Sequence, residues 1–196
     1  MASQYNAEQI QLTKESLFDA LMQLMAHKDF NDLSISAVTR KAGVSRMAFY
    51  RHYNILEDLI SEHLDDIITD YQMKITKNQI NNYELADVFF VCFREHLQFI
   101  LNLQRSRLTG MVFDKLVNFV TLFSESVICV DGCTSEVTDY NIRFVVGAFF
   151  SVLMSWSQNG MKESAEQMAM LICDELSKHI SGIVSVQSFS TLEKSV

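Results

Sequence analysis

The chain has 196 residues, of which 48% are hydrophobic and 20% are charged, and this composition excludes a disordered or low-complexity protein. Its net charge of −8 also excludes a uniformly basic nucleic-acid binder, but the charge is unevenly distributed. The window from Leu33 to Leu56 contains four basic residues and no acidic one, so it carries +4 and the rest of the chain carries −12.

Targeting and membrane signals are weak in this sequence. The first twenty residues are mixed and polar, unlike a signal peptide, and the longest charge-free apolar stretch, residues 144–161, is interrupted by Ser, Gln and Asn. This stretch predicts a buried helix. The four cysteines are scattered, which favours reduced thiols. We expect a cytoplasmic protein with no membrane partner.

The predicted fold class is all-α. The chain has no proline and only six glycines, and apolar residues recur at spacings of three and four. In chain order, the predicted helices cover residues 8–27, 35–42, 45–52, 55–77, 83–102, 104–109, 111–127, 135–158 and 163–184.

The composition changes near residue 56. Residues 1–56 carry six bases and five acids, whereas the remainder carries ten bases and nineteen acids. Ten of the fourteen phenylalanines lie between Phe89 and Phe150. We therefore predict a small N-terminal domain of residues 1–54 and a larger helical domain of residues 55–196.

Residues 33–53 have the pattern of a helix-turn-helix motif. Ser34 is placed to cap a first short helix, and Ser45 is placed to cap a second one. Gly43 lies where the first helix must end, and glycine tolerates the left-handed conformation that a C-terminal cap requires. Two short helices that meet at a glycine turn predict a motif whose second helix fits the major groove of DNA.

The side chains predicted on the second helix suit contact with DNA. Arg46 and Arg51 can pair with phosphates or reach guanine edges, and Tyr50 and His52 can donate hydrogen bonds to backbone oxygens. Met47 can approach thymine methyl groups. The alternative is a solvated basic helix pair without a partner, and the absence of acids across this window argues against it.

The run Lys41-Ala-Gly-Val-Ser-Arg-Met-Ala-Phe-Tyr-Arg-His-Tyr53, followed by Glu57 and Leu59, resembles the DNA-binding domain of the TetR (tetracycline repressor-like) family of bacterial transcription regulators. The resemblance covers roughly residues 10–65. The stretch from Trp156 to Ser164 is similar to the turn before the last helix in a branch of that family, the dihydroxyacetone-kinase-operon regulators.

The resemblance implies an N-terminal three-helix domain that binds DNA and a C-terminal helical bundle for ligand binding and dimerisation. The residues that it implies at the DNA are Ser34, Ser36, Ser45, Arg46, Met47, Tyr50 and His52, and the residue types on the second helix add Arg51. Phe49 is expected to pack behind the motif. The family often has a lysine where this chain has Leu56, so a phosphate contact at that position is in doubt.

A dimer surface is expected on the last two long helices. The first of them has more apolar surface than one helix face can hide, although a central core helix would look the same. The family resemblance favours a homodimer, whose two motifs would read half-sites of a palindromic operator about 34–36 Å apart. The candidate interface residues are Phe144, Ala148, Phe149, Val152, Trp156, Met168, Ile172 and Leu176.

The phenylalanine-rich region predicts either a plain core or a pocket for an unidentified small apolar or aromatic effector. The candidate lining residues are Phe89, Phe93, Arg94, His96, Phe113, Tyr140 and Arg143. We expect an effector to reposition the helix that begins near Ile55 and so to spoil the spacing of the two DNA-binding motifs.

No catalytic constellation or cofactor motif is present, and the histidines and cysteines show no metal-ligand spacing. Cys129 and Cys133 lie four residues apart, and they have two interpretations: a redox-sensitive thiol pair, or two ordinary thiols without a function, which is the simpler one. The predicted function is a non-enzymatic TetR-like regulator. The resemblance to the family is the only basis for expecting a repressor and not an activator. Two alternatives stay open: a regulator of the same fold that a partner protein controls, and a helical interaction protein without a DNA function.

Overall fold

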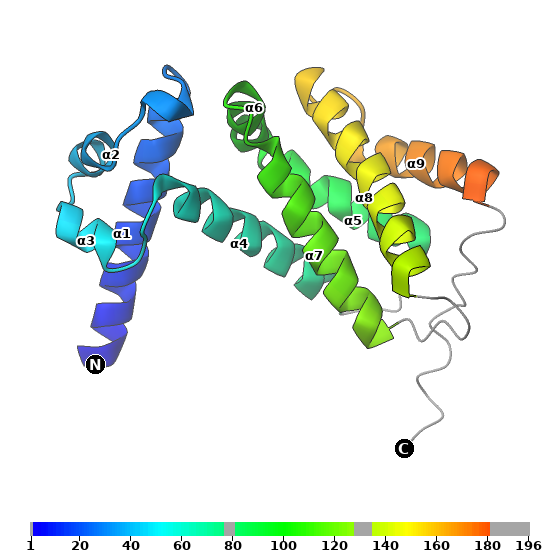
Figure 1. Ribbon diagram of the computed structural model, residues 1–196, viewed down its shortest axis with the longest axis horizontal. Helices are drawn as coiled ribbons and strands as arrows, with labels where there is room; N and C mark the ends of the chain where they lie inside the picture. Colours follow the sequence, from blue (N-terminus) through cyan, green and yellow to red (C-terminus); the bar gives the residue numbers. More distant parts are fainter. Residues whose placement is uncertain (1, 77–80, 128–134, 181–196) are drawn as a thin grey trace. The chain divides into compact units, whose positions relative to one another are not determined.

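The computed structural model describes residues 2–76, 81–127 and 135–180. Every regular element in these ranges is a helix, which confirms the all-α prediction. In chain order they are α1 (Ala2–Met25), the 3-10 turn η1 (Phe30–Asp32), α2 (Ile35–Ala42), α3 (Arg46–Tyr50), α4 (Leu56–Thr76), α5 (Asn82–Arg94), α6 (Leu97–Arg105), α7 (Thr109–Val127), α8 (Ser135–Gln158) and α9 (Ala165–Ile180) (Figure 1).

The prediction was wrong between residues 83 and 109, where the structure has different helix boundaries. The expected helix over 83–102 is two helices, because α5 ends at Arg94 and the amide of His96 bonds to the carbonyl of Phe93, three residues back. The expected helix over 104–109 does not form. Instead α6 ends at Arg105, and Arg107 turns the chain with a φ of 59°. Neither break has a proline or glycine to signal it.

The chain forms two compact units. Among the described residues, unit 1 comprises those up to Asp66 together with Gln98–Thr109, and unit 2 comprises those in the range Ile67–Leu97 together with those from Gly110 onward. The chain of α4 passes from unit 1 into unit 2 at Ile67. The functional boundary expected after residue 54 stays a prediction.

In the core of unit 1, α1 packs against α2, and α2 packs in turn against α3. Leu17, Leu21 and Met25, which recur at a spacing of four along α1, are fully buried. Burial of each such side chain contributes about 1.5–3 kcal/mol. These contacts give α2 and α3 a rigid support that two short helices would lack on their own.

The core of unit 2 is aromatic. Phe89 and Phe90 of α5 lie against Phe149 of α8, with ring centroids 5.1 and 6.0 Å apart. Phe90 also meets the buried Trp156 edge-on at 5.5 Å. Helix α5 packs against α9 as well. Such edge-on and stacked ring pairs add to the stability that burial supplies.

Candidate nucleic-acid interface

The turn between α2 and α3 has the geometry that the sequence predicts. The hydroxyl of Ser34 accepts the amide of Ala37 at 3.2 Å, and the hydroxyl of Ser45 accepts the amide of Ala48 at 3.1 Å. Gly43 has φ 70° and ψ 22°, in the left-handed region. Both serine caps and the glycine turn are therefore confirmed, and they set where each short helix begins and ends.

The inner side of the motif is anchored by Val38 and Phe49, which are both fully buried. The Phe49 ring lies 5.5 Å from the rings of Tyr50 and Tyr53. Phe49 packs inward, as expected. With Phe49 as its anchor, the five-residue helix α3 turns its other side chains outward.

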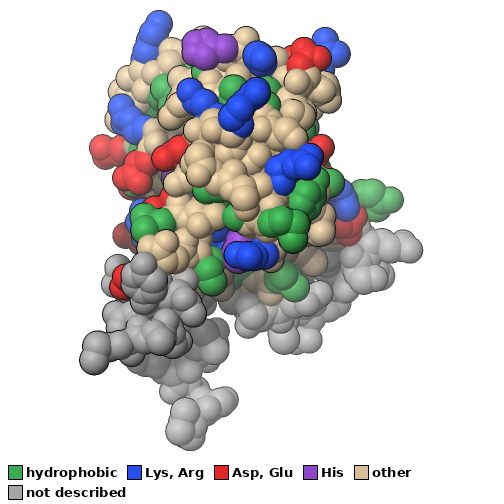
Figure 2. All heavy atoms as spheres, turned by 90° about the vertical axis from the view of Figure 1, so that its left-hand side faces the viewer, with side chains coloured by type: hydrophobic (Ala, Val, Ile, Leu, Met, Phe, Trp, Pro, Cys, Tyr) green, Lys and Arg blue, Asp and Glu red, His purple; other side chains and the backbone are tan. Residues whose placement is uncertain are grey.

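The outer side of the motif presents the candidate DNA-binding residues to solvent. Met47 is 67% exposed and Tyr50 53% exposed, although both carry large apolar groups. Ser34, Ser36, Ser45, Arg46 and Arg51 are also exposed, and His52 is half-buried. Figure 2 views the side of the molecule on which α2 and α3 lie, where basic side chains are spread over the face and acidic ones gather toward its edges. This surface can bind a polyanion.

Position 56, where the family that the sequence resembles often has a lysine, holds a leucine at the start of α4. Leu56 is only 7% exposed and belongs to the core, whereas its neighbour Ile55 is 52% exposed. One carboxylate oxygen of Asp58 accepts the amides of Asn54 at 2.7 Å and of Ile55 at 3.1 Å. Leu56 therefore contributes packing, and a charged contact with phosphate is not available from this position.

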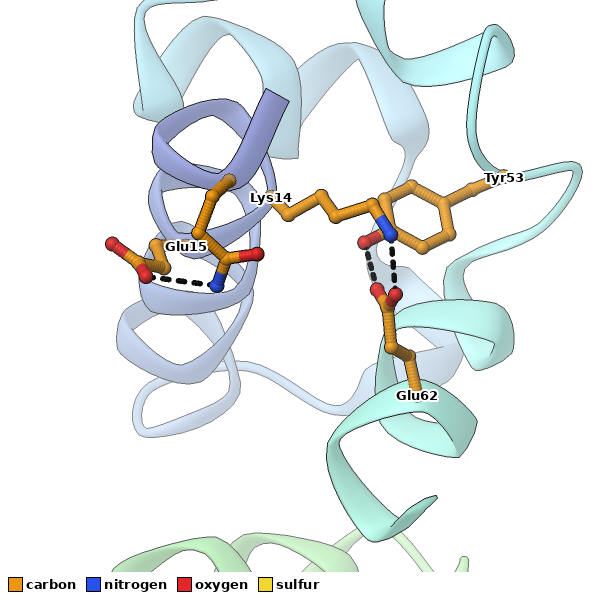
Figure 3. Close-up of polar contacts among 5 residues, drawn as sticks. Lys14, Glu15, Tyr53 and Glu62 are labelled. Atoms are coloured by element: carbon orange, nitrogen blue, oxygen red, sulfur yellow. Dashed lines mark hydrogen bonds and ion pairs between the residues drawn. The ribbon is translucent and has the colours of Figure 1, made fainter. Parts of the chain in front are cut away.

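A polar cluster lies behind the motif, within unit 1 (Figure 3). The hydroxyl of the buried Tyr53 donates to Glu62 of α4, and the ammonium of Lys14 of α1 lies 2.5 Å from the same carboxylate. Burial and the hydrogen bond to Glu62 raise the pKa of Tyr53 above its usual value. Burial alone would raise the pKa of Glu62, but hydrogen bonds from Lys14 and Tyr53 outweigh it and lower that pKa overall.

Sequence reasoning missed this cluster. Lys14 and Glu62 are separated by 48 residues and have no local pattern in common. Of the three residues, only Tyr53 lies in the run of residues 41–53 that carries the resemblance, and there it was treated as an aromatic position and not as a hydrogen-bond donor. Pairing among these side chains depends on how α1 packs against α4, which periodicity does not reveal.

Helix α6 holds the C-terminal end of α1. The guanidinium of Arg105 donates to the carbonyls of Met25 at 3.3 Å and Ala26 at 2.8 Å, and the Asn102 amide donates to the carbonyl of Met22 at 3.4 Å. The carbonyls of Met25 and Ala26 lie at the helix end, where backbone acceptors lack partners within the helix, whereas the carbonyl of Met22 also accepts the amide of Ala26. A cation there also interacts favourably with the helix dipole.

The candidate effector residues of α5 lie in and beside the aromatic core of unit 2. Phe89 and Phe93 are buried, and their ring centroids are 4.8 Å apart. Arg94 is exposed, and its guanidinium lies 6.0 Å from the Trp156 ring. The indole nitrogen of Trp156 is buried and has no hydrogen-bond partner.

The other candidate effector residues are more scattered. His96 is half-buried, and burial lowers its pKa. Phe113 is half-buried and meets Phe150 at 5.5 Å. Tyr140 is 73% exposed and Arg143 is also exposed, so these two lie on the surface of α8. The structure groups the phenylalanines of α5 and leaves the polar candidates of α8 at the surface.

The candidate interface residues divide between core and surface. Trp156, Met168 and Ile172 are buried in unit 2 and contribute to its core. Ala148, Phe149, Val152 and Leu176 are half-buried, and Phe144 is 57% exposed. Met170 and Leu171 of α9, which were not among the candidates, are each 51% exposed.

The remaining sequence candidates give little further chemistry. Cys129 and Cys133 lie outside the described residues. Within the described ranges, Cys92 is a buried free thiol, and burial raises its pKa to about 11. The described residues contain no cluster of three or more His, Cys, Asp or Glu side chains suited to a metal ion. None of the described helices has the length and hydropathy to cross a membrane.

The capped motif and its exposed basic side chains define a helix-turn-helix transcription regulator. Two family models match the chain: bacterial regulatory proteins of the tetR family over residues 14–62, and a transcriptional regulator C-terminal region over residues 81–178. The second match alone covers half of the sequence. The chain belongs to the TetR family, as predicted.

Individual relatives are more distant. An uncharacterized HTH-type transcriptional regulator of Haemophilus influenzae is 39% identical over 61 residues, which make up 31% of this chain and 30% of that protein. Lin0861 of Listeria innocua has a similar solved structure, with 16% identity, a TM-score of 0.72, and coverage of 87% of this chain and 91% of that one. The dihydroxyacetone kinase operon activator DhaS has 16% identity, a TM-score of 0.55, and coverage of 86% and 96%. At such identities, these two structures indicate a common fold only.

Proposed function

We propose that the chain is a homodimeric repressor that binds a palindromic operator through α2 and α3 and is released by a small effector in unit 2. The observation that carries the DNA-binding part is the capped, acid-free motif with Arg46, Tyr50 and Arg51 exposed on its outer side. Cationic and phenolic groups on a short, anchored helix are suited to the phosphates and base edges of a major groove. The cytoplasm, where bacterial DNA lies, is the proposed location.

The experiment that tests DNA binding is selection of duplexes from a random pool, followed by affinity measurements at several salt concentrations. We expect a palindromic consensus and an affinity that falls steeply with salt, because each neutralised phosphate releases counterions. Arg46→Ala should cost about 1–3 kcal/mol on the selected duplex and relax base preference at one position. Lys162→Ala, which removes one positive charge from the exposed turn before α9 in unit 2, is the control and should leave affinity unchanged. Absence of duplex binding in dilute salt would refute the proposal.

The dimer part is supported by apolar side chains that unit 2 leaves exposed on α8 and α9. Tyr140 and Phe144 are one turn apart on α8, and Met170 and Leu171 lie on α9. An added Cβ at Gly147 would meet no atom within 4 Å, so another helix has room to approach α8 closely. Such a set of exposed apolar groups is typical of an interface with a second copy.

Sedimentation of paired variants tests the dimer. Phe144→Asp should convert the dimer to a folded monomer, because the introduced charge would be buried between subunits without a partner. The control is Leu122→Asp on α7, a position that is 68% exposed and should leave the assembly intact. A monomeric parent protein, or a Phe144→Asp variant that remains dimeric, would contradict the proposed interface.

The effector part is supported by the aromatic cluster around Trp156. Its indole nitrogen is a buried donor without an acceptor, which costs free energy unless something supplies one. Arg94 lies over the same ring and could pair with a carboxylate. These features favour an apolar or aromatic effector that carries a hydrogen-bond acceptor.

Trp156 is the single tryptophan of the chain, so its fluorescence reports directly on this region. Titration with aromatic carboxylates should change that emission and weaken operator binding in parallel, and Phe89→Ala should reduce both responses. If no compound changes either signal, control by a partner protein becomes the favoured alternative. A reporter gene placed behind the selected operator determines whether the regulator represses or activates.

A further inference from the structure

The cluster of Lys14, Tyr53 and Glu62 joins three elements of unit 1 that are separate in the sequence. Lys14 lies on α1, Tyr53 follows α3, and Glu62 lies in the second turn of α4. The Glu62 carboxylate receives the Tyr53 hydroxyl on one oxygen and the Lys14 ammonium on the other (Figure 3). The Lys14 and Glu62 side chains are 28% and 36% exposed, so solvent only partly screens this pair.

Tyr53 connects this carboxylate to α3, the second helix of the helix-turn-helix. Its amide donates to the carbonyl of Phe49 at 3.0 Å, and its ring lies 5.5 Å from the Phe49 ring. Phe49 is the buried residue of α3. A continuous path of contacts therefore runs from Glu62 through Tyr53 to the inner side of α3.

A helix of five residues cannot fix its own orientation. Helix α3 contains little more than one turn, and an isolated helix of that length is unstable in water. Its orientation must come from anchors at its two ends. Ser45 and the glycine turn provide the first anchor, and Phe49 with Tyr53 provides the second.

We propose that Glu62 is a positioning residue for DNA recognition, which acts through Tyr53 to fix the angle at which α3 presents Arg46 and Tyr50. Lys14 holds the carboxylate in place. The inference rests on the proposed DNA-binding function and adds a residue on α4 that touches no DNA. Because the chain of α4 continues into unit 2 beyond Asp66, the residue that positions α3 belongs to the helix through which an effector would act.

Paired charge-removal variants test the role of Glu62. Glu62→Gln and Glu15→Gln each remove one negative charge, and Glu15 is an exposed residue of α1 that bonds to Gln11 and faces away from the cluster (Figure 3). Electrostatics alone would make both variants bind DNA slightly more tightly. We expect Glu15→Gln to follow that trend. On the duplex that the parent protein selects from a random pool, Glu62→Gln should instead lose about tenfold in affinity, since a charged hydrogen-bond acceptor is lost.

A second variant separates positioning from folding. Tyr53→Phe keeps the ring against Phe49 and removes only the hydroxyl bond to Glu62. Well below the melting temperature, where all variants are folded, both variants should lose affinity for the selected duplex and stay within about twofold of the parent on a scrambled duplex. Because the two changes interrupt one path, the double variant should lose no more than the larger single loss.

Three outcomes would overturn the inference. The first is parental affinity of Glu62→Gln for the selected duplex, and the second is an equal loss on selected and scrambled duplexes, which would indicate a general effect on charge or folding. The third is fully additive losses in the double variant. If the parent protein binds no duplex at all, the proposed function fails and the positioning role fails with it.

Discussion

Substitution of Gly43 by alanine tests the cost of backbone strain alone, because the position has no steric crowding. It has φ 70°, and a Cβ added to it would meet no atom within 4 Å. The cost of Gly43→Ala is therefore conformational: an L-residue in the left-handed region costs about 1–2 kcal/mol, and alanine recovers about 0.4–1 kcal/mol by restricting the unfolded chain. We expect a net destabilisation of about 1 kcal/mol, which lowers the melting temperature of a chain of this size by about 2–4 °C.

Gly110 provides the matched control because it has equal space around it and a different backbone. It is the second residue of α7, and an added Cβ there also meets nothing within 4 Å. Gly110→Ala should stabilise the protein by about 0.5 kcal/mol, since alanine is the better helix former. Gly43→Asn should cost less than Gly43→Ala, because asparagine tolerates the left-handed region.

Urea denaturation followed by circular dichroism at 222 nm measures all three variants on one scale. We expect the two alanine substitutions to change the free energy of unfolding in opposite directions. A change of the same sign at both glycines would refute it, as would a Gly43→Ala variant as stable as the parent. A loss of several kcal/mol at Gly43 would point instead to a steric clash that the structure does not contain.

Three further predictions concern other contacts. Arg105→Met removes the donors to the carbonyls of Met25 and Ala26 and should destabilise the protein by about 1–2 kcal/mol in thermal melts, whereas an unchanged melt would contradict the cap. Because the pKa of Cys92 is raised to about 11, this buried thiol should resist iodoacetamide at pH 8 until urea exposes it, as mass spectrometry would detect. Because the pKa of Glu62 is lowered in the folded state, its ionisation stabilises the fold above the usual glutamate pKa, and this stability is lost as pH falls through the folded value. Glu62→Gln should flatten that acid-side loss in pH-dependent melts.

The motif was predictable because its determinants are local. Ser34 and Ser45 each bond to an amide three residues ahead, and Gly43 adopts its conformation within a single turn. Such bonds depend on spacing along the chain, so they can be read from one segment without knowledge of its neighbours. Periodicity likewise sufficed to predict the helical fold class.

Periodicity did not suffice where helices break without a local signal. Between α5 and α6 the chain has neither proline nor glycine. After α6, Arg107 adopts a left-handed conformation, which is uncommon for residues other than glycine and is not predicted by an arginine in the sequence. Periodicity also did not show which apolar residues of α8 and α9 are buried within unit 2 and which are exposed. Trp156 and Met168 look like interface residues in the sequence, and burial places both in the core of unit 2.

The sequence alone determined the helical class, the capped helix-turn-helix and the family, because each depends on the spacing of residues that lie a few positions apart in the chain. Only the tertiary structure decided the contacts between distant segments: Lys14 meets Glu62 across 48 residues, and Arg105 reaches the end of α1 across 80. The physical reason is that a hydrogen bond between distant residues forms only after packing has set the helices side by side. A linear pattern of side chains does not specify that arrangement.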